Sequence, residues 1–213
     1  MSKYAHLRLE YKKEKLSEES VETNPLTQFD IWFQEAMNAE VPEPNAFALA
    51  TSGPLGIPSA RIVLLKGVDR DGFVFYTNYN SDKAKDIAYN SHVSMCFLWH
   101  ELERQVRITG RAAKVSRDES EIYFHSRPRE SQIGAWVSPQ SDVIASRDVL
   151  DQKLAEVTAL YENTDIIPLP DHWGGYRVIP EEIEFWQGRP NRLHDRITYK
   201  NIDGHWKIKR LAP

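Results

Sequence analysis

The hydrophobic and polar positions of the chain fall into two patterns. One has helical spacing, and the other consists of short apolar runs separated by turn-forming residues. The first predicted helix spans 26–39, where apolar side chains recur on one face: Leu26, Phe29, Trp32, Phe33 and Ala36. Further helices are predicted at 81–90, 117–126, 128–135 and 146–162. Strands are predicted at 46–52, 58–67, 73–78, 92–99, 104–115, 176–179, 183–187, 195–200 and 205–211.

The order of these elements predicts the fold class. Consecutive hairpins without regular strand–helix alternation favour an antiparallel barrel over a doubly wound sheet. The chain has 213 residues, of which 41% are hydrophobic and 27% charged, so it can bury a substantial core. Residues 1–24 are charged and lack a sustained apolar period, which predicts a flexible N-terminal arm that orders only against another surface. Residues 25–213 are predicted to form a single domain.

Charge and cysteine content narrow the function classes. A formal net charge of −4 argues against nucleic-acid binding driven by counterion release, so any anion site is local. The single Cys96 has no intrachain partner, which predicts a reducing compartment, and its apolar surroundings predict a buried core thiol. No apolar stretch reaches membrane-spanning length, and the polar N-terminus is unlike a signal peptide. We therefore expect a cytoplasmic protein without a membrane partner.

The segment from Trp186 to Arg196 concentrates three guanidiniums, an imidazole and an indole in eleven residues. Arg192, His194 and Arg196 recur at every second residue, so in an extended segment they project from one face. Such a surface suits an anionic, planar ligand. An ordinary basic edge strand is the alternative explanation.

Two further groups of polar residues have spacings that suggest ligand binding. Arg61 and Lys66 lie at the two ends of a run of four aliphatic residues, which suggests anion binding. Cations at the solvent-exposed ends of an ordinary strand would give the same pattern. Tyr123, Arg127 and Ser131 have helical i, i+4, i+8 spacing, but Pro128 predicts a second helix that leaves Arg127 at a junction. Two explanations fit these three residues: a phosphate-binding site, called the cradle below, or an ordinary pair of surface helices. No histidine has metal-ligand spacing to another, so we expect no metal site.

Taken together, these motifs resemble the pyridoxine (pyridoxamine) 5′-phosphate oxidase family over nearly the whole chain from Arg8. The similar segments are Arg61-Ile-Val-Leu-Leu-Lys66, Phe75-Tyr-Thr-Asn78, Glu103-Arg-Gln-Val-Arg107, Tyr123-Phe-His-Ser-Arg-Pro128, Ser131-Gln-Ile-Gly134, Trp186-Gln-Gly188, Arg192-Leu-His-Asp-Arg196 and Arg210-Leu-Ala-Pro213. The resemblance implies a mainly β (α+β) fold, an FMN-binding split barrel of Greek-key type with flanking helices. It also implies a homodimer with FMN at the subunit interface. The implied reaction oxidises pyridoxine 5′-phosphate and pyridoxamine 5′-phosphate to pyridoxal 5′-phosphate, with O2 reduced to H2O2.

The resemblance assigns site residues by position. The implied FMN-binding residues are Arg61, Ile62, Val63, Leu64, Leu65, Lys66, Tyr76, Thr77, Lys83, Gln105, Gln140, Ser141, Trp186 and Arg196. The implied substrate-binding residues are Arg8, Tyr11, Lys66, Tyr123, Arg127, Ser131, Arg192 and His194, with Arg192 and His194 also catalytic. Arg8 and Tyr11 belong to the arm, which the resemblance makes a lid over the occupied site.

One departure from the family pattern is Asp82, where many members carry a basic residue. We expect Arg61 and Lys83 to carry the phosphate charge, and Asp82 to cap the helix that begins there. Two other functions remain open. A flavin reductase or a reductase of another cofactor would share the barrel without needing the Tyr123, Arg127 and Ser131 cradle. A non-enzymatic carrier of FMN or pyridoxal 5′-phosphate would keep both sets of residues and show no turnover.

Overall fold

The computed structural model describes residues 10–213. Nine strands of this part of the chain form one sheet: β1 Ala46–Ser52, β2 Pro58–Leu64, β3 Gly67–Asp69, β4 Gly72–Asn78, β5 His92–Trp99, β6 Arg104–Lys114, β7 Trp173–Gln187, β8 Asp195–Ile202 and β9 His205–Arg210. The helices are α1 Pro25–Asn38, α2 Asp82–Tyr89, α3 Arg117–Ser126, α4 Arg129–Val137 and α5 Arg147–Tyr161, with short 3₁₀ turns η1 His100–Leu102 and η2 Pro190–Arg192.

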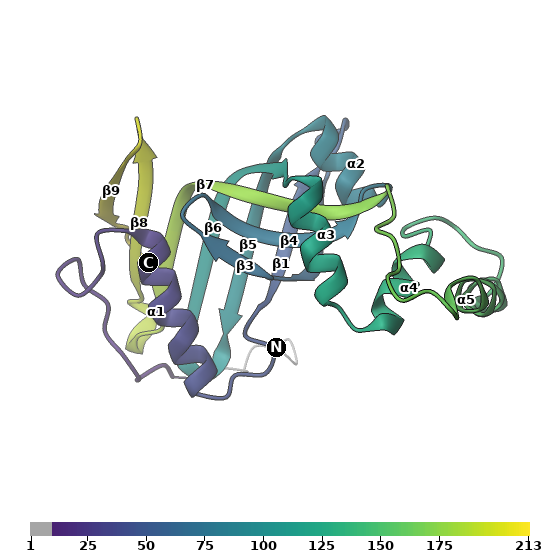
Figure 1. The fold of residues 1–213 in the computed structure, drawn as a ribbon. Coiled ribbons are helices and arrows are strands. Elements are labelled where there is room, and N and C mark those ends of the chain that lie inside the picture. Colours follow the sequence, from purple (N-terminus) through teal and green to yellow (C-terminus); the bar gives the residue numbers. More distant parts are fainter. Residues whose placement is uncertain (1–9) are drawn as a thin grey trace, which may run out of the picture.

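The sheet is antiparallel, and its strand order is β2-β1-β5-β6-β7-β4-β3. The long strand β7 pairs with β6 along most of its length, with β4 through its first half and with β8 through its last six residues. Figure 1 shows the sheet curling around, with the β8–β9 hairpin at one end and α3, α4 and α5 at the other. The prediction of a mainly antiparallel barrel with flanking helices is confirmed.

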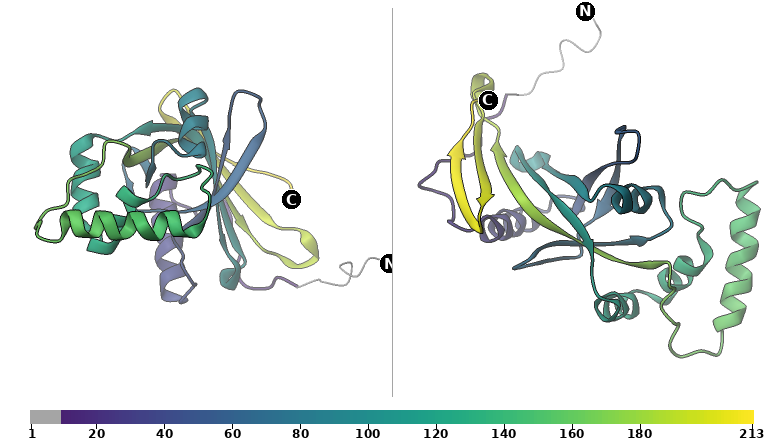
Figure 2. Two further views of the ribbon diagram at one scale, coloured as in Figure 1. Left: turned by 90° about the vertical axis from the view of Figure 1, so that its right-hand side faces the viewer. Right: turned by 90° about the horizontal axis from the view of Figure 1, so that it is seen from above.

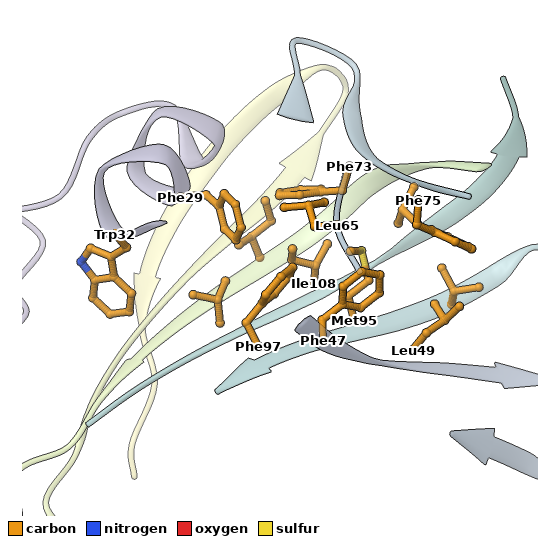
Figure 3. Packing of buried hydrophobic residues seen from close by; sticks show 14 of the residues in the cluster. Phe29, Trp32, Phe47, Leu49, Leu65, Phe73, Phe75, Met95, Phe97 and Ile108 are labelled. Carbon is orange, nitrogen blue, oxygen red and sulfur yellow. The ribbon is translucent and has the colours of Figure 1, made fainter. Parts of the chain in front are cut away.

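Helix α1 closes the interior of the curled sheet. Its first turn is fixed by Pro25 at a position where no amide hydrogen bond is lost, and by the Asn24 side chain, which accepts from the amide of Leu26. Phe29 is 0% exposed, and its ring lies 4.9 Å from Phe73 and 5.2 Å from Phe97, centroid to centroid. Figure 3 shows these rings meeting between helix and sheet, so burial of this face is what holds α1 in place.

A second, smaller apolar cluster lies outside the barrel. It is formed by side chains from α3, α4 and the chain before and at the start of β7, among them Phe124, Ile133, Ile167 and Trp173. Helix α5 has no fully buried residue and stands away from the sheet (Figure 2), packing mainly against α4. None of the helices formed by residues 10–213 is both long and apolar enough to traverse a lipid bilayer.

The structure corrects the two strands predicted at 176–179 and 183–187, because they are parts of the single strand β7. The gap between the two predicted strands contains Pro180, and proline cannot donate to a ladder. The partner strand accommodates it: the register with β6 shifts between Thr109 and Gly110, and a Cβ at Gly110 would lie 2.1 Å from the Ile179 carbonyl oxygen. The irregularity lets the strand continue through the proline. The strand predicted at 58–67 also ends earlier, at Leu64.

The prediction that Cys96 is a buried core thiol is wrong. Met95 and Phe97 are 0% exposed and face the core, so Cys96 between them points to the opposite face of β5 and is half-buried. Partial burial raises the pKa of its thiol. Only alternate residues of the apolar run around Cys96 face the core, because β5 has one buried face. The composition of the run does not show which residues these are.

The described part of the N-terminal arm lies along the C-terminal hairpin. Leu16 packs into the main core, and its amide donates to the Asp195 carboxylate. The Tyr199 hydroxyl donates to the carbonyl oxygen of Glu22, 2.6 Å away. These contacts join residues nearly 180 positions apart in the sequence. Arg8, assigned to the substrate site by resemblance, lies outside the described residues.

Replacing Phe29 with Ala is expected to lower the free energy of unfolding by about 3–5 kcal/mol, because the change leaves a cavity among tightly packed rings. Urea denaturation monitored by tryptophan fluorescence measures it. Ile122→Ala is the control: its side chain on α3 is 75% exposed, so we expect a change within about 0.5 kcal/mol. Equal effects of the two substitutions would contradict this assignment of the core.

Candidate functional site

A cavity of about 610 Å³ opens between β2, β4, α3 and α4. Its lining contains eleven of the site residues expected from sequence: Ile62, Val63, Leu64, Lys66, Tyr76, Thr77, Lys83, Tyr123, Arg127, Ser131 and Gln140. Leu65 is buried in the main core instead. The cavity has the size of a small-molecule site, and its walls combine aromatic rings with cations and hydroxyls.

The cradle predicted from Tyr123, Arg127 and Ser131 is formed at a helix junction. Helix α3 ends at Ser126, Arg127 is extended, and α4 begins after Pro128, with Ser131 in its first turn. The Gln132 side chain fixes this junction by donating to the Arg127 carbonyl oxygen at 2.8 Å. The predicted second helix is confirmed, with its first residue one position later than expected. All three side chains reach the same cavity.

Arg127 is held against an aromatic wall and has capacity to bind an anion. Its guanidinium carbon lies 4.6 Å from the centre of the Trp173 ring, and the nearly parallel rings of Tyr76 and Tyr123 stack with their centroids 3.9 Å apart. Nη1 of Arg127 is buried and has no hydrogen-bond partner in the part of the chain that is described. Burial lowers the pKa of this guanidinium, as expected for a partly desolvated cation that has no carboxylate partner within residues 10–213. An anion entering the cavity would satisfy it.

Lys83 provides a second cationic position. Its Nζ donates to the Gln140 side-chain oxygen at 3.0 Å, to Ser81 Oγ at 3.2 Å and to Thr77 Oγ1 at 3.3 Å. All three acceptors are neutral, and burial together with nearby Arg61 lowers the pKa of the Lys83 ammonium. Arg61 itself is not among the lining residues, because its guanidinium turns back to the β1–β2 hairpin. The two cations still lie close enough to affect each other.

Five further site residues assemble elsewhere, around the end of β7. The ring centroids of Trp186 and His194 are 4.5 Å apart, and Tyr11 lies 5.8 Å from each. Gln105 on β6 and Arg196 on β8 are the register partners of Trp186 on either side. This second group is the His194 cluster, defined here as Tyr11, Gln105, Trp186, His194 and Arg196.

The cavity and the His194 cluster lie at opposite ends of one strand. Trp173 lines the cavity at the first residue of β7, whereas Trp186 is the last but one. Thirteen residues of strand span roughly 40 Å. The structure therefore brings most of the predicted site residues together in two groups, and within one chain the groups are separate.

The predicted extended face of Arg192, His194 and Arg196 is wrong. Arg192 ends the 3₁₀ turn η2 and has φ +62°, whereas strand β8 begins at Asp195, as predicted. The preceding Asn191 also has a positive φ, so the chain turns here and the three side chains do not share one extended face. Arg196 points to Glu184 with two hydrogen bonds of 2.8 and 3.0 Å. Its charge is therefore compensated, unlike that of Arg127.

The structure also differs from the expectations for two residues near α2, Ser141 and Asp82. Ser141 is not among the cavity-lining residues; its Oγ accepts from the Asp82 amide at 3.2 Å. The helix N-cap is Ser81, which makes no side-chain cap bond, and the Asp82 carboxylate instead lies 3.7 Å from the Lys85 ammonium. The expectation that Asp82 caps the helix through its side chain is therefore wrong, because its carboxylate turns along the first turn to Lys85.

The family models agree with this arrangement. The model "Pyridoxamine 5′-phosphate oxidase" matches residues 33–161, more than half of the chain, and "Pyridoxine 5′-phosphate oxidase C-terminal dimerisation region" matches 173–213. The chain belongs to the pyridoxamine 5′-phosphate oxidase family. The first model covers the cavity residues from β2 to α4, and the second covers all of β7, β8 and β9.

Individual relatives agree with this membership. A pyridoxine/pyridoxamine 5′-phosphate oxidase of Trichormus variabilis is 57% identical, with 98% of each chain covered. The crystal structure of PhzG from Burkholderia lata in complex with tetrahydrophenazine-1-carboxylic acid is 30% identical, with a TM-score of 0.88 over 95% of this chain and 100% of that one. An FMN-binding protein of Nostoc punctiforme, related to pyridoxamine 5′-phosphate oxidase, shares the fold. It is 16% identical, with a TM-score of 0.70 over 94% of this chain and 100% of that one.

Sequence reasoning missed Trp173, the ring behind Arg127. The available signal was the pair of glycines that follows it. A Cβ at Gly174 would lie 2.2 Å from the Tyr79 hydroxyl, and one at Gly175 would lie 2.8 Å from the Tyr76 ring. Such glycines mark close packing of the strand against side chains. In residues 10–213, no three His, Cys, Asp or Glu side chains gather as a metal ion would require.

Trp173→Leu is expected to weaken inorganic phosphate binding about tenfold, because a desolvated cation–π contact contributes roughly 1–2 kcal/mol to holding Arg127. Calorimetric titration at constant ionic strength, in a Lys83→Met background that removes the second cationic position described above, measures the dissociation constant. Trp136→Leu is the matched control, since Trp136 packs beside Tyr161 outside the cavity lining. Equal dissociation constants for the two variants would argue against a role for Trp173 in orienting Arg127.

Proposed function

We propose that the protein is an FMN-dependent oxidase that converts pyridoxine 5′-phosphate and pyridoxamine 5′-phosphate to pyridoxal 5′-phosphate, in biosynthesis and salvage of vitamin B6. O2 is reduced to H2O2, and the amine substrate also consumes water and releases ammonia. Family membership supports the reaction. The observation that carries the substrate class is the buried Arg127 guanidinium, with an unpaired N–H, beside aromatic rings. A planar ring with a phosphate ester matches both features.

The chain offers two separate positions for phosphate, as a flavin nucleotide and a phosphorylated substrate require. Lys66, Tyr123, Arg127 and Ser131 would hold the substrate phosphate, because they share the wall of the cavity at the α3–α4 junction. Arg61 and Lys83 would hold the phosphate of FMN, since among the described residues both hydrogen-bond only neutral oxygens. A dianion between them would relieve their mutual repulsion.

FMN, when bound, supplies the acceptor for the two electrons removed from the substrate. The remaining chemistry belongs to the chain. Tyr76, Thr77 and Gln140 would contact the cofactor from the cavity side, and Gln105, Ser141, Trp186 and Arg196 complete the cofactor set that we propose. The aliphatic residues Ile62, Val63 and Leu64 give the cavity an apolar edge that helps exclude water.

His194 is prepared to donate a hydrogen bond. Its Nδ1 accepts from the Arg189 amide at 3.1 Å, which leaves Nε2 as the protonated nitrogen of the neutral ring. Burial and the neighbouring Arg192 lower the pKa of the imidazole, so the neutral form predominates at pH 7. We assign His194 and Arg192 to orienting the substrate and assisting proton movement.

The two groups of residues would meet in a homodimer, the assembly indicated by the match to a dimerisation region. The cavity of one protomer would face the His194 cluster of its partner, because a strand separates the two within each chain. Residues 25–213 would act as one domain. The arm of residues 1–24 would cover the His194 cluster, a role supported by the contacts of Tyr11 with Trp186 and His194.

We also place the protein in the cytoplasm. Its single cysteine is free, which fits a reducing compartment. A flavin reductase remains less suitable than an oxidase, because it has no use for a second phosphate position at Arg127. A carrier would use both positions without turnover, so an activity measurement separates it from the oxidase.

Aerobic incubation with pyridoxine 5′-phosphate is expected to yield pyridoxal 5′-phosphate and H2O2 in equal amounts. Absorbance of the aldehyde product and a peroxidase-coupled dye measure the two products in the same sample. Dephosphorylated pyridoxine is the control substrate, and it should react far more slowly because Arg127 has no anion to bind. Bound substrate without either product would identify a carrier instead.

Mixing two inactive variants tests whether the site is shared between subunits. Arg127→Met damages the cavity, and His194→Ala damages the cluster at the other end of β7. After co-expression, half of the dimers carry one of each chain, and each mixed dimer has one intact site of two. About a quarter of wild-type activity is therefore expected, as measured by H2O2 formation. Recovery of no activity, with mixed dimers present, would place both residues in a site formed by one chain.

A further inference from the structure

Thr51, near the end of β1, is a buried residue that links helix α2 to the β1–β2 hairpin. It is 2% exposed, its hydroxyl donates to the Asp86 carboxylate at 2.7 Å, and its oxygen accepts from Nη1 of Arg61 at 2.7 Å. The direction of both bonds is fixed, because a carboxylate only accepts and a guanidinium only donates. The single hydroxyl proton is committed to Asp86, so the lone pairs of Thr51 are directed to Arg61.

Arg61 is further restrained by two neutral oxygens. Nη1 also donates to the Leu49 carbonyl oxygen at 3.2 Å, and Nη2 donates to Ser59 Oγ at 2.6 Å. Three of the five guanidinium N–H groups are thereby used. Nε–H and the second N–H of Nη2 form no hydrogen bond within residues 10–213, so they are available to a ligand. Asp86 orients the guanidinium through a hydroxyl and leaves its charge free for that ligand.

The position of the Asp86 carboxylate is closely determined. A Cβ at Gly53 would lie 2.5 Å from Asp86 Oδ1, so the carboxylate packs against bare backbone just after β1. Asp86 also lies three residues after Lys83 on α2, and residues at this spacing share one side of a helix. Helix α2 therefore provides one cation directly and anchors the other through Thr51. The distance between the two cations depends on this connection.

We propose that Thr51 and Asp86 are positioning residues for Arg61, which orient its free N–H groups toward the phosphate of FMN. This inference rests on the proposed function, in which Arg61 and Lys83 bind that phosphate. It assigns a ligand-directed role to two residues that line no part of the cavity. The reduced pKa of Lys83, caused by burial and by Arg61, agrees with two cations held close together for a shared anion.

Thr51→Val tests the proposal, because valine has nearly the shape of threonine and no hydroxyl. The full-length protein is stripped of flavin and titrated with FMN or with riboflavin, which lacks the phosphate, by following flavin fluorescence. We expect FMN to bind about tenfold more weakly and riboflavin to bind unchanged, because one hydrogen bond to a charged group is lost. Thr51→Ser keeps the hydroxyl and should stay within about twofold of the wild type.

The controls separate positioning from general damage. Ser120→Ala removes another buried hydroxyl, on α3, and should change neither affinity. If Thr51→Val does not fold, Asp86→Asn keeps an acceptor while removing the charge, and a smaller phosphate-specific loss is expected. Equal weakening of FMN and riboflavin, or unchanged FMN affinity, would overturn the proposal. Arg61→Met tests the premise of the proposal, that Arg61 binds the phosphate of FMN. If that variant binds FMN normally, the assignment of Arg61 in the proposed function is wrong.

Discussion

Continuous pairing of β7 is the constraint on which the rest of the structure depends. This strand runs for fifteen residues, paired with β6 along most of its length, and carries the cavity at its first residue and the His194 cluster near its last. A strand fixed by hydrogen bonds on both sides cannot fold back on itself, so the two groups stay apart in any single chain. A register shift opposite Pro180 preserves this continuity where the sequence would otherwise end the strand. Under the proposed function, dimerisation is then required for the chemistry, since a second copy of the chain would bring the imidazole and the phosphate cradle together.

The second determinant is electrostatic. Arg61, Lys83 and Arg127 are cations bonded to neutral oxygens or stacked on a ring, whereas Arg196 and Arg177 have carboxylate partners. Partly buried charges without counterions cost stability, and the lowered pKa values of Lys83 and Arg127 express that cost. Under the proposed function, binding of phosphate esters would offset this cost and contribute to affinity. The contrast therefore distinguishes arginines whose charge is free to bind an anion, Arg61 and Arg127, from those whose charge is already paired with a carboxylate, Arg177 and Arg196.

Much of the fold could be predicted from sequence, because apolar periodicity and turn residues are local signals. Helix α3 and strand β1 have the predicted bounds, and the helix junction at Pro128 followed from the chemistry of proline. Errors arose where a distant partner overrides a local signal. The gap predicted between residues 179 and 183 is bridged by pairing with β6, the shared extended face expected of Arg192 and His194 is broken by the turn at Asn191, and Cys96 faces outward from an apolar run. Trp173 and Thr51 belong to no motif, and their importance depends on contacts between elements far apart in the chain. The family resemblance supplied the residues of both groups, but their separation required the fold.

The most direct measurement of the central claim is a crystal structure of the protein with FMN and pyridoxal 5′-phosphate bound. The account predicts that one FMN contacts Arg61 and Lys83 of one protomer and Trp186 and Arg196 of its partner, with the aldehyde product between Arg127 of the first and His194 of the second. Its phosphate should lie within hydrogen-bond distance of Arg127 Nη1. A flavin surrounded by Lys83, Trp186 and His194 of the same chain would contradict the account, because it would require β7 to bend between its two ends.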